Sequence, residues 1–127
     1  MIPGGDLVSI LDKGGLPAPF GREILLLQTY VAGTGYVPGV GDLVSSMNAG
    51  ERLILRREPD NSHDRMAILV LTTSGTKVGY IPRRDNTVIA RLMDAGKAIY
   101  AVVTAVGPGE HPARINVDVM MHDGYGF

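Results

Sequence analysis

The sequence feature that most constrains the fold is a polar loop between two short apolar runs, within residues 53–71. Residues 53–55 read Leu-Ile-Leu and residues 67–71 read Ala-Ile-Leu-Val-Leu. Pro59 has no backbone donor and a fixed φ, so it ends the first run as a strand. Asp60 and Asn61 favour turns. The pattern predicts two strands joined by a stiff loop crowded with polar groups. Binding sites are often built this way, but composition alone favours a well-capped hairpin with a solvated tip.

The other apolar runs are also short and are separated by glycine and proline, which favours strands over long helices. One clear amphipathic helix is predicted near residues 86–95, with Asp85 as its N-cap and Val88, Ile89, Leu92 and Met93 on its apolar face. A short helix is predicted at 42–47. Several short strands around one helix favour a small β-barrel or rolled sheet over a parallel α/β fold. The predicted strands are 23–32, 51–57, 67–71, 77–81, 98–106 and 115–121.

A chain of 127 residues suits one domain with a real core. We expect an N-terminal arm at 1–22, a barrel domain at 23–121 and a C-terminal tail at 122–127. The apolar cluster at 7–11 is compatible with a short strand, a helical turn or a loose arm. No apolar run approaches the roughly 20 residues of a membrane helix, and no signal peptide is recognised, so we expect a cytoplasmic protein without a membrane partner.

Charge is unevenly distributed along the chain, although the formal net charge is only −1. Residues 52–91 hold eight basic and four acidic side chains, a net +4, while the rest of the chain is at −5. Arg56 and Arg57 precede the polar loop, and Arg83 and Arg84 open the predicted helix, where anions are attracted. The middle of the chain is therefore the candidate anion-facing region.

Two kinds of catalytic site are alternatives to simple binding. Ser62, His63 and Asp64 are adjacent on one turn and cannot adopt the relay geometry of a catalytic triad. Asp60, His63 and Asp64 could ligate a metal ion, with His111 or His122 arriving from elsewhere, as in a metal-dependent hydrolase or nuclease. No repeated ligand spacing supports that site, and the absence of cysteine excludes both thiolate zinc ligands and disulfides.

The run 56–68, together with Lys77-Val78-Gly79-Tyr80-Ile81-Pro82-Arg83 and residues 86–90, resembles the HIRAN domain family. The resemblance covers residues 24 to about 118. It implies an OB-like antiparallel β-barrel of about six strands with one or two short helices. Family members are accessory modules of Swi/Snf-type helicase-like ATPases that remodel stalled replication forks, or free-standing bacterial and phage proteins. The resemblance implies capture of the 3′ end of single-stranded DNA through its free hydroxyl.

The resemblance also assigns roles to single residues. Asn61 and Asp64 match polar positions that approach the terminal sugar, and His63 falls where relatives often carry an aromatic ring. Tyr36 matches an aromatic position that packs on a terminal nucleotide, and Tyr80 and Arg83 match positions near the DNA backbone. With Arg56 and Arg84 from the basic region, these form the predicted DNA-binding set.

This chain departs from the family pattern at three places. Asp60 replaces an asparagine and Ser62 a common proline. Residues 107–109, Gly-Pro-Gly, supply no stacking ring where relatives carry one.

The sequence therefore predicts a non-enzymatic DNA-binding module that needs no metal or cofactor. Its expected partners are single-stranded DNA with a free 3′ end and, through the resemblance, a helicase-like ATPase or another repair protein. A metal-dependent hydrolase or nuclease and a protein–protein module without DNA binding are the alternatives.

Overall fold

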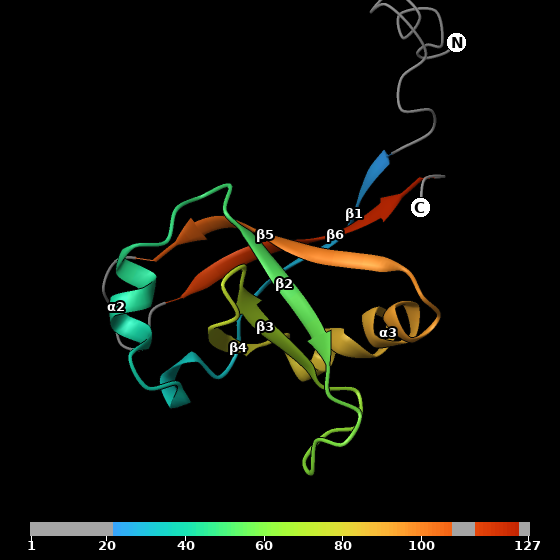
Figure 1. Cartoon of the computed structure of the whole chain (residues 1–127), viewed down its shortest axis with the longest axis horizontal. Helices are drawn as coiled ribbons and strands as arrows, with labels where there is room; N and C mark the ends of the chain where they lie inside the picture. The colour runs from blue at the N-terminus through green and yellow to red at the C-terminus, as the bar shows by residue number, and fades with distance from the viewer. Residues whose placement is uncertain (1–21, 108–113, 125–127) are drawn as a thin grey trace, which may run out of the picture.

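The computed structural model describes residues 22–107 and 114–124, which form one antiparallel six-stranded sheet with two α-helices and a short 3₁₀ helix (Figure 1). The predicted mainly-β fold is confirmed. In chain order the elements are β1 (Arg22–Tyr30), η1 (Thr34–Tyr36), α2 (Val40–Ser45), β2 (Arg52–Arg57), β3 (Ile68–Thr72), β4 (Lys77–Tyr80), α3 (Arg83–Asp94), β5 (Ala98–Val106) and β6 (Ile115–Asp123).

The sheet rolls up without closing along its full length. Its strand order is β1-β6-β5-β2-β3-β4, which leaves β1 and β4 at the two edges. The edges meet only beyond the end of β1, where Ala32 forms an isolated bridge with Tyr80 through two backbone hydrogen bonds of 2.7 and 2.9 Å. The fold is therefore OB-like, but the barrel is open, and its two edge strands are joined only through the Ala32–Tyr80 bridge.

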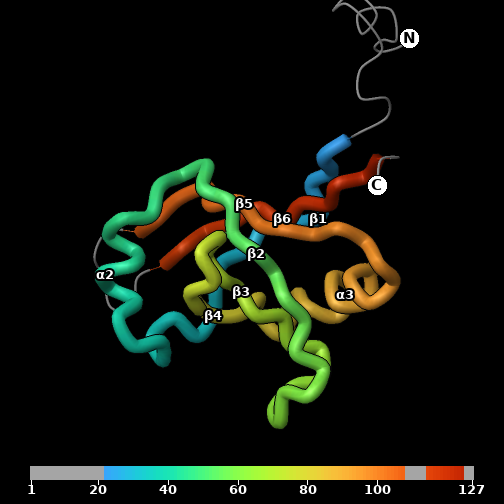
Figure 2. Tube along the Cα trace, viewed as in Figure 1, coloured from blue at the N-terminus to red at the C-terminus, as the bar shows by residue number. Residues whose placement is uncertain are grey.

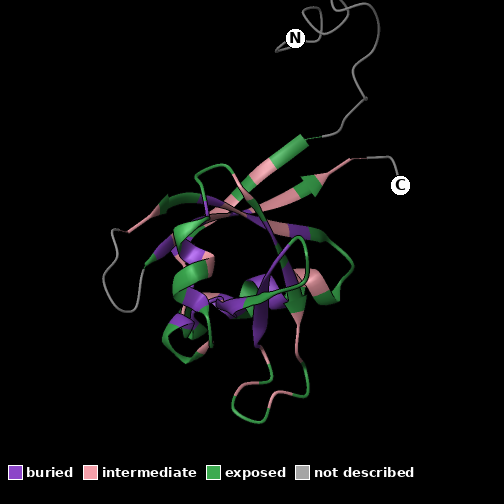
Figure 3. Cartoon of the chain, turned by 60° about the vertical axis from the view of Figure 1, so that its left-hand side comes forward, coloured by how far each residue is buried: buried purple, intermediate pink, exposed green. Residues whose placement is uncertain are grey.

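Strand β2 shows how the sequence pattern creates an inside and an outside. Leu53 and Leu55 are buried, whereas Arg52, Ile54 and Arg56 on the other face are exposed, as the alternation predicts. The buried faces of the strands line the interior of the rolled sheet (Figure 3). Arg56 and Arg57 consequently point to opposite faces.

Helix α3 differs from its prediction in start and orientation. It begins at Arg83 directly after Pro82, and no side chain caps it; Asp85 instead accepts a 2.7 Å hydrogen bond from the Thr29 hydroxyl. The predicted N-cap at Asp85 is therefore wrong, because the fixed φ of Pro82 already leads the chain into the helix. Val88 is also misplaced in the prediction, since it is 66% exposed. The buried face of the helix carries Asn86, Ile89 and Ala90, and α3 packs against β5 and β2.

Several other predictions have simple outcomes. The short helix expected at 42–47 is α2, two residues earlier in the chain. The 7–11 cluster and the terminal residues 125–127 lie outside the described residues, as does most of the 107–109 turn. Strand β6 runs to Asp123, where it pairs with Arg22. No helix in the described part of the chain is long and apolar enough to cross a membrane.

The polar loop that joins β2 to β3, residues 58–67, projects from the body of the fold (Figure 2). It begins and ends on a backbone hydrogen bond of 3.0 Å from Glu58 N–H to the Ala67 carbonyl. The loop therefore starts as a continuation of the β2–β3 hairpin.

Candidate functional site

Asn61 organises the tip of the 58–67 loop. Its side-chain oxygen accepts hydrogen bonds from the backbone N–H groups of His63, at 2.8 Å, and Asp64, at 3.1 Å. Its amide nitrogen donates to Glu58 Oε1 at 3.1 Å. A side chain that satisfies the backbone of its own turn gives a loop a defined shape. The order Asp-Asn-x-x-Asp thus has a structural cause as well as a functional interpretation.

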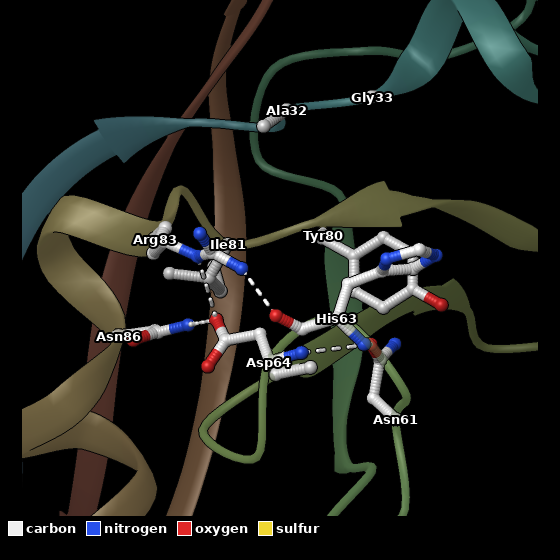
Figure 4. Close-up of a pocket in the computed structure, with 10 residues that line it drawn as sticks. Ala32, Gly33, Asn61, His63, Asp64, Tyr80, Ile81, Arg83 and Asn86 are labelled. Carbon is white, nitrogen blue, oxygen red and sulfur yellow. Dashed lines mark hydrogen bonds and ion pairs between the residues drawn. The ribbon is translucent and has the colours of Figure 1, made fainter.

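Asp64 ties the loop to helix α3. Its Oδ1 accepts a 2.8 Å hydrogen bond from Met66 N–H, and its Oδ2 accepts a 2.8 Å bond from Asn86 Nδ2 (Figure 4). Arg83 Nε lies 3.5 Å from the same Oδ2, and a guanidinium nitrogen of Arg83 also donates to the His63 carbonyl. The carboxylate is therefore held in one orientation by two hydrogen bonds and an ion pair.

Tyr80 is positioned by Glu58. Its hydroxyl donates to Glu58 Oε1 at 2.8 Å, the same oxygen that receives the Asn61 amide. Lys77 lies over the Tyr80 ring, 4.9 Å from its centroid. One carboxylate thus couples the loop to strand β4.

These groups converge on one pocket of about 320 Å³. Figure 4 shows the loop residues facing β4 and the start of α3 across it. Its walls come from the segment after β1, the 58–67 loop, β4 and α3. The lining residues are Ala32, Gly33, Asn61, His63, Asp64, Ala67, Tyr80, Ile81, Arg83 and Asn86.

Hydrogen bonds keep two carboxylates ionised, Asp64 in the pocket and Glu58 behind its wall. The Asn86 hydrogen bond, followed by that of Met66, lowers the pKa of the Asp64 carboxyl. The Asn61 hydrogen bond, reinforced by Tyr80, lowers the pKa of Glu58. Burial and the bond to Glu58 raise the pKa of Tyr80, so its phenol stays protonated and donates. At neutral pH the pocket therefore offers a fixed carboxylate beside an arginine.

Five of the eight predicted DNA-binding residues line the pocket together. They are Asn61, His63, Asp64, Tyr80 and Arg83.

The remaining three lie elsewhere. Tyr36 lines an adjoining pocket, and Arg84 lies 3.4 Å from Asp85 and 5.3 Å from the Tyr30 ring centroid. Arg56 is exposed on β2 and lines neither pocket. Arg57, named only as part of the basic region, is occupied by the fold: it bonds both Asp94 oxygens and two backbone carbonyls.

Three residues important for the pocket were missed from the sequence. Asn86 is 2% exposed on the buried face of α3, where a polar residue always requires a partner. Glu58 was seen only as part of the loop. Gly79 lies in β4 where an added Cβ would collide with the Ala32 carbonyl oxygen. A glycine inside a strand commonly marks such a close approach, so this signal was available.

Within residues 22–107 and 114–124, no three acidic, histidine or cysteine side chains gather closely enough to hold a metal ion. Asp64 is directed to Asn86 and Arg83, and His122 contacts Glu23 at 2.5 Å instead. His111 lies outside the described residues.

Comparison with known proteins gives the same family as the sequence motifs. Residues 24–122 match the model of the HIRAN domain. The helicase-like transcription factor of Oryctolagus cuniculus is 35% identical over 68 residues, 54% of this chain, and that of Mus musculus is 37% identical over 60 residues, 47% of this chain. The aligned segment is 6% of each relative's length.

Solved structures agree with the sequence matches. A crystal structure of a Lactobacillus plantarum protein superposes with a TM-score of 0.74 at 28% identity, covering 81% of this chain and 98% of that one. The HIRAN domain of human HLTF superposes with a TM-score of 0.64 at 25% identity, covering 80% of each chain. Since the family model spans most of the chain and the fold agrees, this chain belongs to the HIRAN domain family.

Proposed function

We propose that this chain is a non-enzymatic nucleic-acid-binding module that captures the 3′ end of single-stranded DNA through its free hydroxyl. The observation that carries the proposal is Asp64: an ionised, rigidly oriented carboxylate on the wall of a nucleotide-sized pocket. Membership of the HIRAN domain family supports the nucleic-acid-binding role. The match to helicase-like transcription factors suggests that a helicase-like partner brings the module to DNA.

The chemistry of Asp64 favours a hydroxyl over a phosphate. A carboxylate offers about four lone-pair positions; Met66 and Asn86 donate hydrogen bonds to two of them, and Arg83 Nε lies 3.5 Å from Oδ2 as an ion pair. The free positions can accept a bond from a sugar hydroxyl, and such a charge-assisted bond is stronger than a neutral one. A terminal phosphate would instead meet the carboxylate with like charge, so the site discriminates by repulsion as well as attraction.

The other pocket residues supply complementary contacts. His63 and Tyr80 provide two rings on one pocket, and flat rings stack on any base. Arg83 has a 70% exposed side chain, so its guanidinium can reach a backbone phosphate at the pocket mouth.

The test is Asp64→Asn, measured by fluorescence anisotropy on labelled oligonucleotides with a free or a phosphorylated 3′ end. Asparagine keeps the shape, and the Asn86 amide can turn to bond its new partner. Losing a bond to a charged acceptor costs about 1.5–3 kcal/mol, so affinity for the 3′-hydroxyl end should fall about tenfold or more. Affinity for the 3′-phosphate end should hold or rise.

The matched control is Asp60→Asn, which removes the same charge from an exposed position on the same loop. It should leave the ratio of the two affinities unchanged. Equal binding of both ends by the unaltered protein would refute end capture. Failure to bind any oligonucleotide would leave the protein–protein module as the better interpretation.

A further inference from the structure

Four large, mostly apolar side chains form a row across the outer face of the sheet, over the neighbouring strands β1, β6, β5 and β2 (Figure 1). In the strand register, Leu25 lies opposite Met120, and Tyr100 lies opposite both Met120 and Ile54. Leu25 is 50% exposed and Ile54 is 40% exposed. The residues that flank Ile54 and Tyr100 along their strands are buried, so the row faces away from the interior. The row is therefore a patch that the described core does not bury.

The row is basic at its β2 end. Arg52 and Arg56 stand on either side of Ile54 on the exposed face of β2. Arg52 lies over the Tyr100 ring, 3.8 Å from its centroid, and this cation–π contact keeps its guanidinium close to the row. Arg56 forms no ion pair within residues 22–107 and 114–124, and it lines neither of the two pockets. Both cations can therefore meet an acidic group of another molecule.

The opposite end of the row, over β6 and β1, is acidic. Glu23 and Asp118 each stand two positions before a row residue on the same strand, so both share its outer face. The Tyr100 hydroxyl donates to Glu23 and lowers the pKa of its carboxyl, so Glu23 stays ionised. Asp118 accepts a 3.1 Å hydrogen bond from the neutral amide of Gln28 and keeps its charge. The sign of the charge thus changes from one end of the row to the other.

We propose that a second copy of this chain packs on this face, turned so that β2 of each copy meets β1 of the other. A two-fold axis parallel to the strands, between β5 and β6, gives this arrangement. Because neighbouring strands are antiparallel, Arg56 and Glu23 lie on the same side of the row, and each Arg56 then faces Glu23 of the second copy. Each Tyr100 ring faces Met120 of the second copy, a favourable contact between an aromatic ring and sulfur.

The charges select this occupant and this orientation. A two-fold contact needs a patch that is complementary to itself, and a row with one basic and one acidic end meets that need. A partner of a single charge sign would match only one end of the row. A two-fold axis perpendicular to the strands would set Arg52 of one copy against Arg56 of the other, which like-charge repulsion disfavours.

The proposed contact is small and leaves the pockets accessible. Four side chains make a patch below the standard interface size, so we expect a dissociation constant between about 10 µM and about 1 mM. None of the row residues lines either pocket, so both pockets of each copy stay open in the dimer. The inference is independent of the DNA ligand proposed above.

Sedimentation equilibrium over that concentration range measures the self-association. The unaltered protein should form dimers and nothing larger, because a two-fold contact is closed. The dissociation constant should rise with salt, because salt screens the charge pairs. Arg56→Glu alone and Glu23→Arg alone each create two like-charge pairs in the dimer, so each should weaken self-association about tenfold or more.

An equal mixture of the two variants is the decisive sample. In the mixed dimer, the glutamate introduced in one copy faces the arginine introduced in the other, and the unaltered Glu23 and Arg56 face each other at the second contact. Both opposite-charge pairs are restored, so the mixture should regain the self-association of the unaltered protein. The matched control is Arg91→Glu, which makes the same charge change at an exposed position on α3 and should leave the dissociation constant unchanged.

Three outcomes would overturn the proposal. The first is an unaltered protein that stays monomeric at every concentration or forms larger assemblies. The second is a mixture that associates as weakly as the separate variants, and the third is an Arg91→Glu protein that is weakened to the same extent. Thermal melts check that each variant folds, and the salt dependence of the unaltered protein gives a readout that needs no variant.

Discussion

Asn86→Asp should reverse the pH dependence of stability at the Asp64 site. Asn86 is 2% exposed and donates a 2.8 Å hydrogen bond to Asp64 Oδ2. The substitution changes almost no volume, but it replaces that donor with a second carboxylate. The effect is therefore electrostatic rather than steric.

The magnitude follows from the contact. Losing a hydrogen bond to a charged group costs about 1.5–3 kcal/mol, and placing a second carboxylate against Asp64 at a position that is 2% exposed raises the cost to about 3–5 kcal/mol. Urea slopes of small domains are about 1–3 kcal/mol/M, so the unfolding midpoint near neutral pH should fall by roughly 1–5 M.

The pH dependence gives a second, independent readout. In the unaltered protein the pKa of Asp64 is lowered, so its stabilising contribution is fully present above the ordinary carboxyl pKa and is lost as pH falls through the lowered value. In Asn86→Asp, two facing carboxylates raise the pKa of the pair. The folded variant then takes up a proton before the unfolded chain does. Its unfolding midpoint should therefore rise between about pH 7 and pH 5 relative to the unaltered protein.

Urea unfolding followed by circular dichroism at several pH values measures both effects. Asn48→Asp is the matched control, because Asn48 is exposed and its amide makes one long contact of 3.4 Å to a backbone carbonyl. That control should change the free energy of unfolding by less than about 0.5 kcal/mol. If the unfolding midpoint of Asn86→Asp equals that of the control and does not rise as pH falls, the role given to Asn86 is refuted.

Two further substitutions test how the fold supports the site. Gly79→Ala should destabilise the protein by about 3 kcal/mol in urea melts, because the added Cβ meets the Ala32 carbonyl oxygen and comes within 2.7 Å of Val31 Cγ1. Its control is Gly41→Ala in α2, where the added Cβ has open space and should stabilise the protein by about 0.5–1 kcal/mol. Arg57→Gln should cost about 1.5–3 kcal/mol through lost bonds to Asp94 and two carbonyls, yet leave the salt slope of DNA binding unchanged; a changed slope would place Arg57 on DNA.

Local patterns in the sequence are sufficient to predict most of the strands and the loop between β2 and β3. The alternation through β2 identifies the buried face, and Pro59 with Asp60 and Asn61 marks the loop where it occurs. The sequence misplaces the start of α3 because it favours Asp85 as the cap, whereas the helix begins after Pro82 and Asp85 accepts a hydrogen bond from Thr29, 56 positions away. A local rule cannot anticipate a competing partner that only the tertiary fold supplies.

The site itself was predictable only in part, for the same reason. The motif placed Asn61 and Asp64 at the pocket, but Asn86 joins them through a contact across 22 positions. In the adjoining pocket, Arg114 lies over the ring of Tyr30, which is far from it in the sequence. Neither pairing leaves a periodic trace in the sequence, so only the rolled sheet reveals them.

The donors around Asp64 also limit what this carboxylate can contribute. A hydrogen bond from a terminal sugar hydroxyl to Asp64, beside those from Met66 and Asn86, would be worth about 1.5–3 kcal/mol. That free energy corresponds to a preference of roughly ten- to a hundredfold between two ends, but micromolar binding needs about 8 kcal/mol. Under the proposed function, selectivity and affinity must therefore come from different groups. Asp64 would select the end, while the rings of His63 and Tyr80 and the guanidinium of Arg83 in the same pocket would supply the rest of the binding free energy.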